Sequence, residues 1–221
     1  MQDTIKILKK LFREPLPGLS SQRLMSPSRI FTGDKYPDPK EAKDSSVFIL
    51  LFQKNEELFI PLIKRTEYNG AHSGQISLPG GKYEHSDITL LETAFRETQE
   101  EIGISREKIT YAGTLTTLYI PNSNFNVVPH VGVLTGEPDF RPNTREVERM
   151  ITLPLKVLVD KSYVKHFERT VKGKTIQAPY YSFEENRIWG ATAMILSEFA
   201  EMIKRSSLVH KSEDHLDLID R

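Results

Sequence analysis

Residues 73–104 read SGQISLPGGKYEHSDITLLETAFRETQEEIGI, and the run RETQEE at 96–101 gives this stretch its pattern. On an α-helix each residue turns the side chain by about 100°, which places Glu97, Glu100 and Glu101 within one sector about 100° wide. The opposite side has the i, i+3, i+4, i+7 spacing of a buried stripe, formed by Leu91, Ala94, Phe95, Thr98 and Ile102. The stretch therefore predicts an amphipathic helix with one acidic face.

The three glutamates on that face repel one another, because like charges at i, i+3 and i+4 on a helix are mildly destabilising. A bound cation would relieve the repulsion, and carboxylate oxygens are ligands that suit Mg²⁺ or Mn²⁺. The simpler interpretation of such a cluster is a solvated helix face. The sequence before the helix favours the metal site, because Gly80-Gly81 permits a tight turn and a close approach of the backbone to a ligand.

A strand, a Gly-Gly turn and a helix with three carboxylates together indicate a metal-assisted phosphate site. Divalent cations held by the carboxylates would neutralise phosphate oxygens and lower the pKa of a bound water, which would attack phosphorus. The predicted reaction class is hydrolysis of a phosphoanhydride bond.

The composition limits the other classes of function. The 221 residues contain 30 Lys and Arg and 30 Asp and Glu, and this zero net charge argues against a protein that coats nucleic acid. The chain has no cysteine, which excludes disulfides, thiolate metal sites and cysteine nucleophiles. This composition fits a reducing compartment, and we expect a cytoplasmic protein.

No run in the chain approaches the length of a transmembrane helix, and we expect no secretory signal at its start. Residues 1–14 form an amphipathic, basic pattern with Ile5, Leu8 and Phe12 on one face, and lysines interrupt the apolar run that a signal peptide needs. A helix lying on a membrane surface fits this pattern, but we favour a terminal helix packed on its own domain or on a partner. Residues 15–46 are rich in Pro and Gly and predict a long loop that wraps the surface or joins an interface. Both segments are compatible with a homodimer.

The order of elements predicts an α+β fold with a mixed sheet between helices, an α/β/α arrangement. We divide the chain into an N-terminal helix and extended segment (1–45), a catalytic domain (46–206) and a polar tail (207–221). Pro61 predicts an edge or a bulge in its strand. Strand-like runs fall at 46–53, 58–64, 76–78, 109–120, 124–134, 147–153, 163–171 and 176–183, and a last helix at about 191–204.

The central stretch resembles the Nudix box, whose pattern is G-x5-E-x7-R-E-U-x-E-E-x-G-U with U an aliphatic residue. Asp87 stands at the first acidic position, eight residues rather than seven separate it from Arg96, and Thr98 replaces an aliphatic residue. Asp87 has two open interpretations, as the N-cap of the helix or as a supporting ion-pair partner. The positions that match are Gly81, Arg96, Glu97, Glu100, Glu101, Gly103 and Ile104.

The longer spacing with Asp is similar to one branch of that family, the coenzyme A pyrophosphatases. The branch carries an upstream motif resembling LLTxRS-x3-R-x3-G-x3-FPGG, which residues 62–81 follow in spacing. Gly70 replaces the second Arg of the motif, and Leu78 replaces its Phe. Further similarity lies at 16–18, 146–155 and 188–193, so the resemblance covers residues from about 15 to about 200.

The resemblance implies that Glu97, Glu100 and Glu101 bind the metal ions, Mg²⁺ or Mn²⁺, and that Arg96 orients a glutamate by ion pairing. Glu100 and Arg96 are therefore the predicted catalytic residues. The position of the general base varies in the family, and it stays open here among Glu100, Glu137 and Glu168.

The implied substrate is a small molecule that contains a nucleotide, bound by Arg65, Gly80, Gly81 and Lys82. For coenzyme A the products are 4′-phosphopantetheine and adenosine 3′,5′-bisphosphate. The missing Arg at Gly70 keeps another nucleoside diphosphate derivative, such as ADP-ribose, as an alternative. A non-catalytic Nudix-fold module that senses a nucleotide or binds a partner is a third hypothesis, which the intact glutamates disfavour.

Overall fold

A computed structural model describes residues 1–28, 41–67, 74–171 and 174–209. The sequence-based interpretation of Gly70, part of the predicted loop at 15–46 and most of the polar tail lie outside these ranges. The helices are α1 (Gln2–Leu11), α2 (Gly18–Arg23), α3 (Leu90–Ile102), α4 (Lys156–Val159) and α5 (Gly190–Ile203), with short 3₁₀ turns η1 (Arg106–Lys108) and η2 (Lys161–Tyr163).

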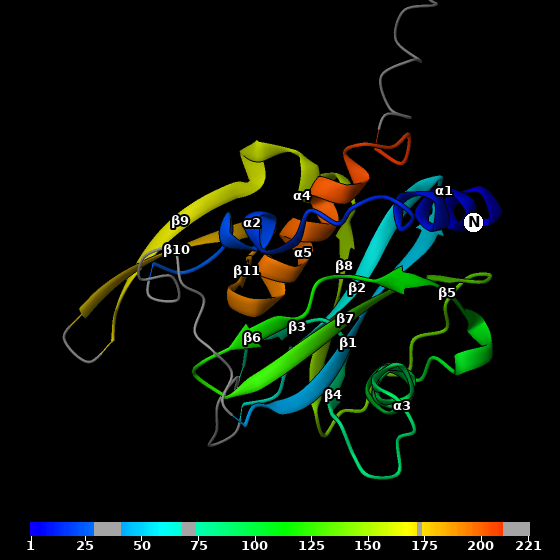
Figure 1. The fold of residues 1–221 in the computed structure, drawn as a ribbon, viewed down its shortest axis with the longest axis horizontal. Coiled ribbons are helices and arrows are strands. Elements are labelled where there is room, and N and C mark those ends of the chain that lie inside the picture. The colour runs from blue at the N-terminus through cyan, green and yellow to red at the C-terminus, as the bar shows by residue number, and fades with distance from the viewer. Residues whose placement is uncertain (29–40, 68–73, 172–173, 210–221) are drawn as a thin grey trace, which may run out of the picture.

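The main sheet has eight strands (Figure 1), and its central path runs β3-β2-β1-β7-β5. β4 pairs with β1, β6 with β7, and β8 with β2. β1 and β7 are parallel and the other pairs are antiparallel, so the sheet is mixed as predicted. The strands are β1 (Lys43–Lys54), β2 (Glu57–Arg65), β3 (Ile76–Ser77), β4 (Gly80–Lys82), β5 (Ile109–Thr114), β6 (Leu118–Ile120), β7 (Phe125–Leu134) and β8 (Val147–Pro154).

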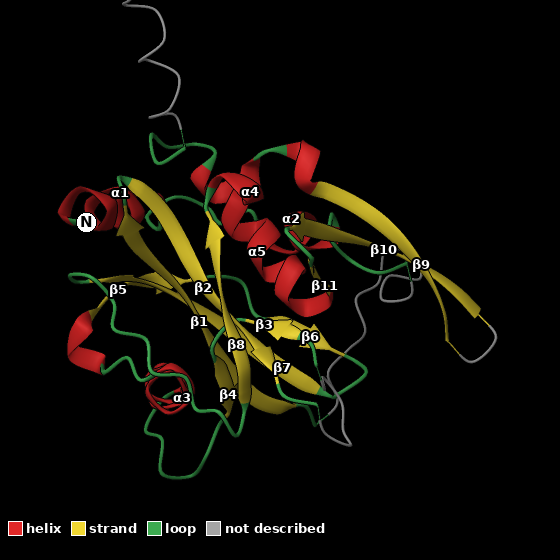
Figure 2. Cartoon of the chain, turned by 180° about the vertical axis from the view of Figure 1, so that it is seen from behind, coloured by secondary structure: helices red, strands yellow, loops and turns green. Residues whose placement is uncertain are grey.

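A second, three-stranded antiparallel sheet lies beside α5, in the order β11-β10-β9. Its strands are β9 (Val164–Val171), β10 (Lys174–Phe183) and β11 (Asn186–Trp189). Figure 2 shows β9 and β10 as a long hairpin that extends away from the end of the molecule where α3 lies. The sequence predicts these strands but does not indicate that they form a sheet of their own.

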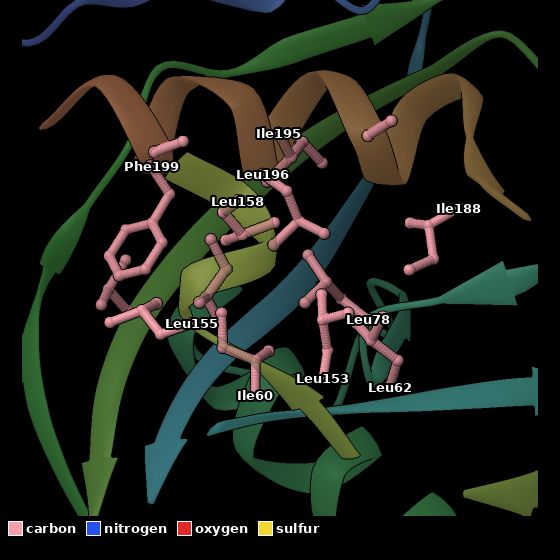
Figure 3. Packing of buried hydrophobic residues seen from close by; sticks show 14 of the residues in the cluster. Ile60, Leu62, Leu78, Leu153, Leu155, Leu158, Ile188, Ile195, Leu196 and Phe199 are labelled. Carbon is pink, nitrogen blue, oxygen red and sulfur yellow. The ribbon is translucent and has the colours of Figure 1, made fainter. Parts of the chain in front are cut away.

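β1 separates two hydrophobic cores because both of its faces are covered. Phe48 and Leu50 point to the α3 side, whereas Ile49 and Leu51 point to the α5 side, and all four are fully buried. This alternation explains why the run at 46–53 is continuously apolar, since a strand buried on both faces has no solvent-facing positions. Figure 3 shows the α5 side, where Leu196 and other residues of that helix pack on side chains from β2 and β8.

α3 forms where the periodicity predicts it. Its first turn is capped by Thr89, whose side chain accepts a 3.2 Å hydrogen bond from the backbone N–H of Glu92. Four of the five predicted stripe residues are buried against the sheet, and Leu91 is partly buried. The helix ends at Gly103, whose backbone is left-handed.

The N-terminal helix packs on its own domain, which confirms the favoured prediction. Leu8 of α1 is fully buried, and Phe12 lies against Gly113 of β5. α2 lies inside the predicted loop and was not expected. It is joined to α5 by Glu198, a fully buried residue whose carboxylate accepts hydrogen bonds from Gln22 Nε2 at 2.7 Å and from the N–H of Gly18 at 3.1 Å. None of the helices in the described ranges is both long and apolar enough to cross a membrane.

One detail of the strands differs from the prediction, and one agrees with it. Residues 109–120 form two strands, β5 and β6, separated at 115–117, rather than one. Pro61 does lie where β2 has only one paired neighbour: it faces Thr152 of β8, while β1 pairs with 57–59 and β3 with 63–64. The missing N–H of proline therefore costs no ladder hydrogen bond on its open side.

Candidate active site

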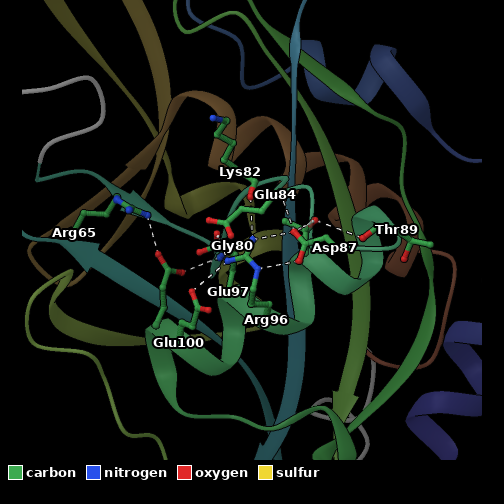
Figure 4. A network of polar contacts seen from close by, with 11 residues as sticks. Arg65, Gly80, Lys82, Glu84, Asp87, Thr89, Arg96, Glu97 and Glu100 are labelled. Carbon is green, nitrogen blue, oxygen red and sulfur yellow. Dashed lines mark hydrogen bonds and ion pairs between the residues drawn. The ribbon is translucent and has the colours of Figure 1, made fainter.

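The acidic helix and the Gly-Gly turn meet at one end of the main sheet (Figure 4). β4 places Gly80 opposite Val47 of β1, and α3 packs on the same strand. β1 therefore contacts both elements: it pairs with the strand that carries the turn, and the helix packs on it. The three glutamates predicted to bind metal face this turn, but their surroundings differ.

Glu101 is buried, with 1% of its side chain exposed. Its Oε2 accepts a 2.8 Å hydrogen bond from the N–H of Gly80, and its Oε1 accepts one of 2.9 Å from Nη1 of Arg65. Burial raises the pKa of Glu101 to about 7, an effect that the Gly80 N–H and the Arg65 charge partly offset. The predicted acidic face is thus not uniformly solvated.

Glu97 lies directly beneath Gly81, and 15% of its side chain is exposed. A Cβ at Gly81 would stand 2.4 Å from the Glu97 carboxyl carbon, so any side chain there would displace this carboxylate. Burial raises the pKa of Glu97, and the hydrogen bond from Arg96 Nη1 at 2.9 Å opposes that shift. The absence of a side chain at Gly81 therefore leaves the room that the Glu97 carboxylate occupies.

Glu100 is the most exposed member of the set, with 56% of its side chain open to solvent. Its Oε2 accepts a 3.2 Å hydrogen bond from Nη1 of Arg96, the same nitrogen that contacts Glu97. One guanidinium therefore bridges two of the glutamates. Of the three carboxylates, Glu100 is the one with ready access to water.

Asp87 holds Arg96 in place by accepting two hydrogen bonds from its guanidinium. Nε donates to Oδ1 and Nη2 donates to Oδ2, at 3.0 Å each. These hydrogen bonds are the chief reason that the pKa of Asp87 falls to about 2. The hydroxyl of Thr93 donates to Oδ2 at 2.8 Å, and Arg96 Nη2 also donates to the carbonyl of Lys82 at 3.0 Å. The N-cap interpretation of Asp87 is wrong because Thr89 caps the helix, and the ion-pair interpretation is confirmed.

The structure gathers the predicted substrate residues Arg65, Gly80, Gly81 and Lys82 around the same turn, with the Lys82 side chain exposed. Two of the three proposed bases are placed elsewhere. Glu168 lies on β9, at the far end of the molecule from α3, and accepts a hydrogen bond from Gln177. Glu137 follows β7, whose last residue, Leu134, lies five residues, or about 17 Å at 3.3 Å per residue, beyond Pro129, the residue level with Gly80.

Glu146 begins the similar stretch 146–155 but was assigned no role in the site from the sequence, and the residue lies just before β8. Its negative charge contributes to the raised pKa of both Glu97 and Glu101, and its side chain is exposed. Its carbonyl accepts a 2.9 Å hydrogen bond from the N–H of Thr66, next to Arg65. The available signal was this similarity together with an acidic residue at the start of a strand, and neither assigns the residue to the site.

The donor set fits a divalent cation by its chemistry, because it consists of carboxylate oxygens. No group of three or more His, Cys, Asp or Glu side chains in the described residues surrounds a single point suited to a metal ion. The carboxylates are instead neutralised in this arrangement by Arg65 and Arg96. The three glutamates that would hold a cation are thus close together, and two guanidinium groups supply the positive charge.

The fold is a mixed sheet between helices, and the site places a carboxylate-rich helix beside a Gly-Gly turn. This combination of fold and site defines a class of protein. The model of the NUDIX domain matches residues 42–172, more than half of the chain. The chain therefore belongs to the Nudix family, and it is a pyrophosphohydrolase of that family.

Curated relatives are similar over three quarters of the chain. Nudix hydrolase 15, mitochondrial, of Arabidopsis thaliana is 32% identical over 76% of this chain, and the match spans 61% of that protein's length. The uncharacterized Nudix hydrolase NudL of Photorhabdus laumondii is 27% identical over 76% of this chain and 91% of its own.

Among solved structures, a MutT/nudix family protein from Enterococcus faecalis superposes with a TM-score of 0.51 at 17% identity, over 77% of this chain and 66% of that one. The MutT protein from Methanosarcina mazei gives 0.50 at 17% identity, over 77% of this chain and 100% of that one. These likenesses show the α+β Nudix fold, as the sequence predicts.

Proposed function

We propose that the chain hydrolyses the phosphoanhydride bond of coenzyme A or its derivatives, giving 4′-phosphopantetheine and adenosine 3′,5′-bisphosphate. The two-point contact between Asp87 and Arg96 carries the proposal. The Asp and its longer spacing resemble the coenzyme A branch, and the contact supports this variant as a working form of the box. Within residues 62–81, which follow the upstream motif of that branch, residues 62–65 form the end of β2 and Gly80-Gly81 form the turn on the other side of the site.

The cofactor in this proposal is Mg²⁺ or Mn²⁺, held by Glu97, Glu100 and Glu101. Nudix hydrolases generally use divalent metal ions. A bound cation would neutralise the phosphate oxygens and lower the pKa of a water molecule at the site.

The chain's own groups orient the ligands and move the proton. The N–H of Gly80 fixes one oxygen of Glu101, and Arg96 fixes Glu97 and Glu100 relative to one another. Glu100 is exposed and accepts the proton of the attacking water in this scheme. The exposed carboxylate of Glu146 is the second candidate for that role, because its charge acts on the same glutamates.

The substrate is held at the turn in this proposal. Lys82 is exposed beside it and is suited to pair with a phosphate as a charge-assisted donor. Gly80 and Gly81 leave the backbone open to close approach. ADP-ribose stays the alternative substrate because Gly70 stands where the coenzyme A motif has an Arg, which would supply a further phosphate contact.

The deciding experiment compares coenzyme A with ADP-ribose as substrates of the purified chain, with Mg²⁺ and with Mn²⁺, and identifies the products by mass. We expect the higher kcat/KM on coenzyme A and the two products named above. A Glu100→Gln variant serves as the inactive control for contaminating phosphatases. A clear preference for ADP-ribose would reject the coenzyme A assignment and leave the pyrophosphohydrolase chemistry intact.

A further inference from the structure

We infer that Arg65 is a built-in counter-cation for Glu101, and that it competes with the metal ion for this carboxylate. The sequence assigns Arg65 to substrate, whereas its guanidinium lies on Oε1 of Glu101 at 2.9 Å. The inference rests on the proposed metal site but not on the identity of the substrate.

The burial of Glu101 creates the need for a nearby positive charge. An ionised carboxylate removed from water is costly unless it is paired and hydrogen-bonded. The negative charges of Glu97 and Glu146 add to that cost, because both act on Glu101. Within the described residues, Arg65 makes the only ion pair to this carboxylate, and the other oxygen receives the uncharged N–H of Gly80.

The N–H of Gly80 uses one acceptor site of Oε2, and the guanidinium of Arg65 lies on Oε1. A cation that binds Glu101 through Oε1 would therefore meet Arg65 directly. Two positive charges a few ångströms apart in a poorly hydrated site repel strongly. Binding of the cation through Oε1 therefore favours withdrawal of Arg65.

The backbone around Arg65 permits this withdrawal without disturbing the sheet. Arg65 is the last residue of β2, where the register with β8 is irregular, and 25% of its side chain is exposed. Its N–H donates to the carbonyl of Gln75 at 3.0 Å, and the next N–H, of Thr66, donates to Glu146. Hydrogen bonds thus fix the main chain at Arg65 and Thr66, while the long side chain of Arg65 borders solvent and has room to move.

The neighbouring residue provides a matched control. Lys64 carries the same charge on the same strand, but its Nζ contacts Oε1 of Glu148 on β8 at 2.7 Å instead of Glu101. A Lys64→Gln variant removes one positive charge from β2 and leaves the Arg65–Glu101 pair in place. Differences between Arg65→Gln and Lys64→Gln therefore report the pair and not the general charge.

The experiment measures Mn²⁺ affinity by calorimetry and the unfolding temperature in EDTA and in saturating Mn²⁺, without substrate. For Arg65→Gln we expect a lower Tm in EDTA, Mn²⁺ binding tighter by at least about fivefold, and a larger rise of Tm on adding Mn²⁺. Lys64→Gln should match the wild type in affinity and in the rise of Tm. Arg65→Lys should fall between, since an ammonium lacks the planar fork of arginine.

Unchanged or weaker Mn²⁺ binding by Arg65→Gln, with an equal loss of Tm in both conditions, would overturn the inference and leave Arg65 a purely structural partner. If Arg65→Gln does not fold, Arg65→Lys decides, because tighter binding supports competition and equal or weaker binding rejects it. The titration needs no substrate, so failure to cleave coenzyme A leaves its outcome interpretable. Failure of the wild type to bind Mn²⁺ would reject the metal site and the inference together.

Discussion

Arg96 holds Asp87 through two parallel contacts of 3.0 Å across nine residues of sequence. This fork geometry fixes the plane of the guanidinium, and the remaining nitrogen, Nη1, then reaches both Glu97 and Glu100. Asp87 therefore acts on the glutamates through Arg96. Asp87, at the longer spacing of this chain, therefore forms the ion pair with Arg96.

The variant Asp87→Asn tests this positioning role. The variant loses the carboxylate charge that pairs with Arg96. We expect kcat to fall by about 10- to 100-fold with little change in KM, because loss of a partner that orients metal ligands usually has an effect of this size. Unfolding free energy should fall by about 2 kcal/mol because a nearly buried pair loses its best hydrogen bonds. Asp139→Asn, which affects an exposed pair with Arg141, is the control. Equal kcat in Asp87→Asn and the wild type would contradict the role.

The sequence predicts the helix and the layers of the fold because both follow from local periodicity. The stripe from Leu91 to Ile102 has a period of one helical turn, and the run at 46–53 has the length and composition of a strand buried on both faces. The box glycines and acids are likewise fixed by spacing within one segment. These features need no information about distant parts of the chain.

The unequal environments of the glutamates were not predictable in this way. Helical periodicity gives the direction of Glu100 and Glu101 around the axis, but their exposure depends on what lies opposite. Arg65 arrives from β2, 36 residues before Glu101, and Glu146 arrives from the start of β8. The N-cap was also ambiguous, since Asp87 and Thr89 are both favoured types and only the path of the loop decides between them.

Replacing Glu101 by Gln should abolish most turnover while the protein stays folded. The amide still accepts from Gly80 and is cheaper to bury than a carboxylate, so Tm should change little. The lost ligand should lower kcat by more than the roughly 10- to 100-fold typical of an outer partner, and should weaken Mn²⁺ binding. Steady-state kinetics and calorimetry measure both effects. Unchanged turnover would reject Glu101 as a metal ligand.

Gly81→Ala should disable the site through Glu97 alone. The new methyl group would stand 2.4 Å from the Glu97 carboxyl carbon and would force that carboxylate away from the turn. We expect a loss of kcat similar to that of Glu97→Gln, and no further loss in the double variant, because both changes remove the same group. Additive losses in this double-mutant cycle would show that Gly81 acts by another route.

His130 should lower the free energy of unfolding as pH falls below about 6.5, while the raised pKa of Glu101 acts in the opposite direction, so the effect of His130 is read as a difference between variants. The imidazole is buried between the rings of Phe48 and Tyr111, and its Nδ1 lies 2.8 Å from the hydroxyl oxygen of Thr114. Burial lowers its pKa to about 4 from an ordinary value of 6.5. The folded state therefore binds fewer protons than the unfolded state between these values, and the contribution present above pH 6.5 is lost as pH falls, by at most about 3 kcal/mol.

Denaturant unfolding at several pH values between 4 and 7 measures this slope. The variant His130→Phe should lose this contribution, so its stability relative to the wild type should rise as pH falls, even if its absolute stability is lower because it lacks the hydrogen bond to Thr114. His85→Gln, in an exposed loop, should retain the wild-type slope. Parallel pH profiles for His130→Phe and the wild type would show that other groups cause the acid sensitivity.

The general base can be identified because its two candidates, Glu100 and Glu146, reach the site from different elements. If Glu100 is the base, Glu100→Gln should lower kcat by about 10²- to 10⁴-fold at saturating Mn²⁺ and remove the acidic limb of the pH–kcat profile. Glu146→Gln should keep that limb and most of the rate. The opposite pattern would assign the proton transfer to Glu146 and leave Glu100 as a metal ligand only. Measuring Mn²⁺ affinity alongside separates the two roles, since a base that binds no metal changes kcat without changing that affinity.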